Sequence, residues 1–186
     1  IFNNIPCPTV HIVGDHARMK IEDAVSQHLA QGRGIDFTKT PTTDRKETGI
    51  HGCQAMSDLL KEMMGLDSGG MDSYYAWLTT WSDSFLRSYV KQKQNNVWMY
   101  TMTLPDPNGS ATSPYHTYCI AVGAGFLDHT PVINWYAKEV ERLMHGKEYY
   151  CGILHRFIHL KLGVLAILAD RPEKCFMLKS SLLGTY

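Results

Sequence analysis

The sequence carries no net charge and has no long apolar run. Eighteen Lys and Arg residues balance eighteen Asp and Glu residues among 186. A chain of this kind has no global field that steers polyanions, so nucleic-acid binding would need a local basic face. The apolar run of residues 162–169 has the length of a strand and is too short to cross a membrane. We therefore expect no membrane association.

The cysteines are few, odd in number and widely spaced, and no CxxC pair occurs. This spacing argues against a disulfide framework and against a zinc ribbon. We expect reduced thiols in an intracellular protein, nuclear or cytoplasmic. The chain starts at Ile1 without Met, and we expect a fragment or a processed product. The five positions are Cys7, Cys53, Cys119, Cys151 and Cys175.

The order of apolar patterns predicts an α/β fold with a mixed sheet, a long β-hairpin and a crossover helix, flanked by helices. We expect one domain over residues 1–186, with an N-terminal βαβ-like segment at 1–48 and a helical insertion at 49–93. A core of hairpin, helix, strand and helix follows at 94–186. The expected strands are 9–13, 34–40, 96–104, 115–123 and 161–169, and the expected helices are 21–29, 130–145 and 172–183.

The insertion is predicted to contain two helices, at 53–64 and 71–93, after a polar linker at 38–49. The second carries Tyr75, Leu78, Trp81 (or Ser82), Phe85 and Tyr89 at helical spacing. An aromatic stripe of this kind is typical of a core-facing helix, and it would also suit a protein partner. A non-catalytic protein-interaction module built on this segment is therefore one functional hypothesis.

Two acids follow apolar strands and are the first candidate site. Asp15 comes after VHIVG, and Asp170 comes after VLAILA and before RPEK. Ligands of open α/β sheets bind at the carboxyl ends of strands, where two acids can share Mg²⁺ or Mn²⁺ for phosphoryl transfer. Glu139, Glu141 or Asp128 could complete the site. The alternative is that Asp15 and Asp170 only cap the turns that follow them.

The segment 97–183, with the hairpin VWMYTMTL/HTYCIAVG, a helix and then GVLAILAD-RPEK, resembles part of the ribonuclease-H-like catalytic core of eukaryotic transposases. The resemblance implies a nucleic-acid-directed domain with DNA as partner, and it makes Asp170 the second of three metal-binding acids. The first acid belongs on the first hairpin strand, where NVWMYTMTL has none, and the third would follow Tyr186. The resemblance therefore implies an incomplete or catalytically degenerate core.

A second candidate site combines Cys53, His116 and Asp128. Cys53 opens a predicted helix, whose positive end lowers a thiol pKa. The order of a cysteine at a helix N-terminus, a histidine on a downstream strand and an acid after it resembles that of papain-like cysteine hydrolases. In that family the imidazole deprotonates the thiol and the acid orients the ring. The alternative is that Cys53 is a buried apolar residue and His116 a hydrogen-bonded strand residue.

His155 and His159 stand four residues apart, a spacing that suits a zinc site on a helix. No HExxH glutamate accompanies them. We take the nucleic-acid-directed domain as the leading hypothesis, the cysteine hydrolase as its alternative and the interaction module as a third.

Overall fold

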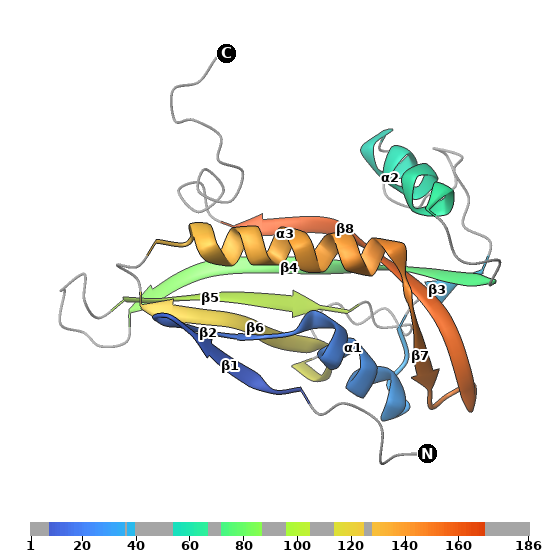
Figure 1. The fold of residues 1–186 in the computed structure, drawn as a ribbon, viewed down its shortest axis with the longest axis horizontal. Coiled ribbons are helices and arrows are strands. Elements are labelled where there is room, and N and C mark those ends of the chain that lie inside the picture. Colours follow the sequence, from blue (N-terminus) through green and yellow to red (C-terminus); the bar gives the residue numbers. More distant parts are fainter. Residues whose placement is uncertain are drawn as a thin grey trace.

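The computed structural model describes residues 8–35, 37–39, 54–66, 72–86, 96–104, 114–124 and 128–169. Within them, one mixed sheet carries helices on both faces (Figure 1). The α/β fold class with a mixed sheet is therefore confirmed. Residues 40–49 of the predicted linker at 38–49 and the predicted helix at 172–183 lie outside the described residues, and Thr38 ends β3. In the described part, no helix is long and apolar enough to cross a membrane.

The sheet has eight strands, seven of them in the order β1-β2-β6-β5-β4-β8-β7, while β3 pairs with β4. All neighbours are antiparallel except β4 and β8, which are parallel. The strands are β1 (Val10–Val13), β2 (His16–Met19), β3 (Phe37–Thr38), β4 (Ser73–Leu86), β5 (Asn96–Thr103), β6 (Thr117–Ala124), β7 (Lys147–Cys151) and β8 (Arg156–Ala169).

Three helices accompany the sheet: α1 (Ile21–Ala30), α2 (Gln54–Gly65) and α3 (Thr130–His145). Local signals set the bounds of α3, because Pro131 fits the first helical turn and Gly146, with φ of 83°, ends the helix. Helix α3 connects the meander of β4, β5 and β6 to β7 and β8. It is the crossover helix that the sequence predicts.

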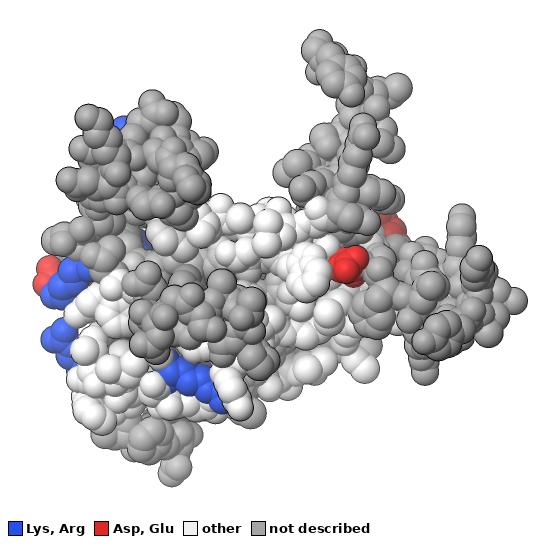
Figure 2. Space-filling view, turned by 180° about the vertical axis from the view of Figure 1, so that it is seen from behind, with Lys and Arg blue, Asp and Glu red and all other residues white. Residues whose placement is uncertain are grey.

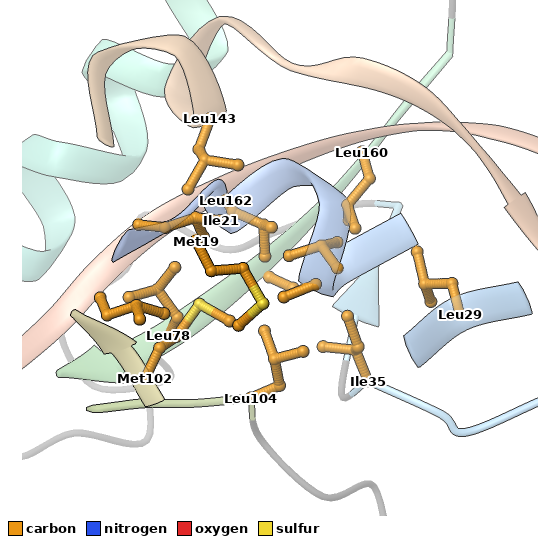
Figure 3. Close-up of a cluster of buried hydrophobic side chains, with 14 of the residues drawn as sticks. Met19, Ile21, Leu29, Ile35, Leu78, Met102, Leu104, Leu143, Leu160 and Leu162 are labelled. Carbon is orange, nitrogen blue, oxygen red and sulfur yellow. The ribbon is translucent and has the colours of Figure 1, made fainter. Parts of the chain in front are cut away.

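The main core lies between the sheet and the layer of α1 and α3. Leu143 of α3 and Ile21 of α1 pack against Leu78 and Met102 from the central strands (Figure 3). The sheet bends around α1, so that the β7–β8 turn reaches the end of that helix, where the Gly152 N–H donates to the Leu29 carbonyl at 2.9 Å (Figure 1). The curved sheet thus encloses one helix and leaves its opposite face to α2.

The predicted helix at 71–93 is wrong, because residues 73–86 form β4, a long strand at the centre of the sheet beside β8. Aromatic and β-branched residues favour a pleated strand, and Ala76, Leu78 and Thr80 alternate as its buried side. Pairing with β8 on one edge and with β3 and β5 on the other overrides the helical spacing. A protein partner bound by an aromatic helix is therefore excluded for residues 73–86.

The N-terminal segment also differs from the expected βαβ order. Val10–Val13 and His16–Met19 form an antiparallel hairpin, because Gly14, with φ of 61°, and Asp15 make a two-residue turn. The second hairpin strand pairs with β6, so that the segment adds an antiparallel edge to the sheet. Residues 147–160, whose sequence pattern favours neither helix nor strand, form β7 and the first part of β8.

Candidate functional site

The ends of β4 and β8 lie next to each other because the two strands are parallel. Ser82 of β4 is the register partner of Ala169, the last residue of β8. The next residue on β4 is Asp83, which is half-buried and pairs with Met99 of β5. Asp170 follows Ala169 in the sequence and lies outside the described residues. The sequence pattern did not point to Asp83, because its segment was assigned to a helix.

The face of the sheet around Asp83 is open and largely uncharged. Side chains alternate along a strand, so Trp81 shares the face of Asp83, and its register partner is Leu168. Both side chains are 53% exposed. Figure 2, which views the molecule from behind, shows few charged side chains on the described surface of this side. An acid on such a face stands beside apolar side chains that a planar group can contact.

Asp15 does not lie beside the end of β8. It sits exposed in the β1–β2 turn, and β2, β6, β5 and β4 separate β1 from β8. Neighbouring strands are about 4.8 Å apart, so two acids share a metal ion readily only across one such step. The structure thus places Asp83, rather than Asp15, at the strand next to β8.

The residues of the thiol hypothesis are not brought together where the structure describes them. Cys53 lies outside the described residues. His116 ends a short 3₁₀ turn before β6, and Asp128 comes after the other end of this eight-residue strand. At about 3.3 Å per residue, the two ends of this strand are roughly 23 Å apart. Asp128 accepts a hydrogen bond from the Thr130 N–H at 2.9 Å and so caps the start of α3.

His116 instead packs edge-on against His28, with ring centroids 4.7 Å apart. His28 is fully buried, and its two ring nitrogens lie 2.9 Å from the Tyr118 hydroxyl and 3.2 Å from the Gly34 carbonyl oxygen. These contacts attach the end of α1 to β6. They give His28 and His116 a packing role.

His155 and His159 also have separate surroundings. His155, with φ of 51°, ends the turn between β7 and β8, whereas His159 is a buried residue of β8 whose Nδ1 lies 2.8 Å from the Ser73 hydroxyl. Burial and the charge of Lys161 lower the pKa of His159, although Glu148 opposes them. No group of three or more His, Cys, Asp or Glu residues suited to a metal ion occurs within the described ranges.

Comparison of the sequence with family models and with curated proteins gave no match. The sheet, the acids at its strand ends and the charged surfaces beside it are the features that bear on the function.

Proposed function

We propose that this chain is a nucleic-acid-directed domain that resembles part of the ribonuclease-H-like core of eukaryotic transposases, with a divalent metal site at the carboxyl ends of β4 and β8. The observation that carries the proposal is the parallel register of Ser82 and Ala169. In the sequence, Asp83 directly follows Ser82 and Asp170 directly follows Ala169, so the two acids come right after a pair of register partners. Two carboxylates on neighbouring strands can supply two of the oxygen ligands of a Mg²⁺ or Mn²⁺ site.

The resemblance implies that the first metal-binding acid lies on a strand next to β8, the strand that precedes Asp170. NVWMYTMTL forms β5, which has no acid and is separated from β8 by β4. Asp83 stands on β4, which pairs with β5 on one side and with β8 on the other. The first acid is therefore assigned to Asp83, in place of Asp15.

The chemistry of such a pair suits phosphate esters. A divalent ion held by two carboxylates stabilises negative charge on phosphoryl oxygens and lowers the pKa of a bound water. Exposed Trp81 and Leu168, on the same face, offer apolar contacts to a sugar or base of the bound strand.

A thermal-shift titration with Mg²⁺ and with Mn²⁺ tests the metal site. A ligand that binds only the folded chain stabilises it by about 2.7 kcal/mol at one hundred times its Kd, so the melting temperature of the wild-type chain should rise. Asp83→Asn and Asp170→Asn should each abolish the rise. Asp15→Asn is the matched control and should retain the rise, because β6, β5 and β4 lie between the β1–β2 turn that holds Asp15 and β8.

Two results would contradict the proposal. One is an equal metal-dependent rise in the Asp83→Asn, Asp170→Asn and wild-type chains, which would place the metal elsewhere. The other is the absence of any rise in the wild-type chain over the concentrations that saturate hard-cation sites. Calorimetric titration with Mn²⁺ measures the same difference directly.

A further inference from the structure

A groove lies between the β1–β2 hairpin and α3, away from the ends of β4 and β8. Its volume is about 460 Å³, which falls in the range of about 300–1,000 Å³ typical of ligand sites. The hairpin contributes residues 11–13 and Arg18, Lys20 follows it at the start of α1, and α3 contributes Trp135, Glu139 and Arg142. Three of these side chains are permanent cations and one is an acid.

The acid in the groove is already engaged. Glu139 is 2% exposed, and its Oε1 accepts a hydrogen bond from Arg142 at 2.8 Å. Its Oε2 accepts the backbone N–H of Ile21, the first residue of α1, at 3.3 Å. Glu139 therefore balances the charge of Arg142 and caps α1, and the groove keeps a net positive charge from Arg18 and Lys20.

The two remaining cations are not paired with acids in the described part of the chain, where the ion pairs involve other residues. The Arg18 guanidinium lies over the Trp135 ring, 5.4 Å from its centroid. This stacking holds the guanidinium over an apolar surface and leaves its N–H groups to bind a planar or tetrahedral anion. The cation is thus oriented by the protein before any ligand binds.

Apolar and aromatic side chains stand beside Arg18. Arg18 is the register partner of His11, so alternation along β1 puts Val13 on the same face, toward α3, whereas Ile12 pairs with Ala17 on the other face. Val13 is half-buried and lines the groove together with Trp135. Cations next to apolar and aromatic side chains are typical of surfaces that bind single-stranded nucleic acid, where phosphates and base faces alternate. An acidic peptide would use the cations and would have no use for Val13 and Trp135.

We propose that this groove binds the sugar–phosphate backbone of single-stranded nucleic acid, with Arg18 and Lys20 on phosphates and Val13 and the edge of Trp135 against a base. The inference rests on the proposed function, because it gives the nucleic-acid-directed domain a second contact surface. It involves none of the acids at the ends of β4 and β8, so the two proposals are tested separately.

The test is fluorescence anisotropy of a labelled oligothymidylate of about twelve nucleotides, within the usual site size of such surfaces. The wild-type chain should bind it with an affinity that falls as salt rises, and Arg18→Gln together with Lys20→Gln should weaken binding at least tenfold. The slope of log affinity against log salt should become shallower by about 0.7 for each phosphate that the variant no longer neutralises. Lys61→Gln removes an exposed cation of α2 and should change neither quantity.

Arg18→Lys keeps the charge and loses the stacked planar group, so it should bind more weakly than the wild-type chain and more tightly than Arg18→Gln, and all variants should melt at the wild-type temperature. Unchanged affinity and slope in the Arg18→Gln/Lys20→Gln variant would overturn the proposal. Displacement of the oligonucleotide by oligoglutamate of equal length and concentration would assign the groove to acidic proteins instead. The metal-dependent thermal shift should persist in this variant. A variant that binds the oligonucleotide more weakly and keeps the metal-dependent thermal shift would therefore show that the groove acts separately from the metal site.

Discussion

The ammonium nitrogen of Lys161 on β8 lies 2.8 Å from the backbone carbonyl oxygen of Met63 on α2. It also donates to the Leu66 carbonyl oxygen at 2.7 Å, and the side chain is fully buried. The carbonyls at the end of a helix carry partial negative charge, so a cation is favourable there. This contact attaches α2 to the face of the sheet opposite to α1 and α3.

Lys161→Met should destabilise the fold by about 2–3 kcal/mol, because it removes two charge-assisted hydrogen bonds and leaves buried carbonyls without them. Urea unfolding measures the difference. Lys39→Met is the matched control: Lys39 is 45% exposed in its ion pair with Asp72, and such a pair contributes at most about 1 kcal/mol. Equal losses of stability in the two variants would show that Lys161 does not support α2.

Gly163→Ala should lower the stability by about 1–3 kcal/mol through overpacking. A Cβ at Gly163 would lie 2.6 Å from Cζ3 of Trp77 and 2.7 Å from Sδ of Met63, so α2 would have to move away from the sheet. Gly65→Ala at the end of α2 meets nothing within 4 Å and should be neutral or slightly stabilising. Melting temperatures of the two variants compare the sites, and an unchanged value for Gly163→Ala would contradict the close packing.

Glu139→Gln should change stability and binding in opposite directions. The amide still accepts the Ile21 N–H and loses the ion pair with Arg142, at a cost of about 1 kcal/mol. The groove gains one positive charge, so the oligonucleotide should bind several-fold more tightly and with a steeper salt dependence. Unfolding and anisotropy on the same sample check both, and weaker binding would contradict the electrostatic role of the groove.

Tyr136 should make stability fall at high pH. Burial raises its pKa from 10.0 to about 12, against the effect of its hydrogen bond with Thr80. The unfolded chain releases this proton near pH 10 while the folded chain keeps it, so stability is lost by about 1.4 kcal/mol per pH unit from there up to about pH 12. Tyr136→Phe should lack this contribution. The difference between the two unfolding curves, measured at about pH 9 and pH 11, isolates it from the other tyrosines; a difference independent of pH would contradict the shift.

Much of the local structure was predictable because its signals are close in sequence. Pro131 and Gly146 set both ends of α3, and the β-branched and aromatic runs predicted β5 and β6 within a residue or two. The fold class followed from the order of these elements. The assignment of residues 73–86 failed because aromatic side chains at helical spacing also alternate, and a local pattern does not show which strand will pair with the segment.

The candidate site was predictable only in part. Asp170 remains a prediction, since it lies outside the described residues. Asp15 follows a strand in the sequence, but this position does not indicate which strands lie beside it. Asp83 became a candidate only through the pairing of β4 with β8. The groove of Arg18 and Trp135 joins a hairpin and a helix that are far apart in the chain.

By itself, the sequence determined the α/β class, the bounds of the three described helices and of β1, β5 and β6 within a residue or two, and the absence of net charge, because periodicity, turn residues and composition act over a few residues. Only the tertiary structure decided that β4 lies between β5 and β8, that Glu139 caps α1, and that Arg18 of β2 faces α3. These relationships come from hydrogen bonds and burial between distant segments, which no local pattern contains.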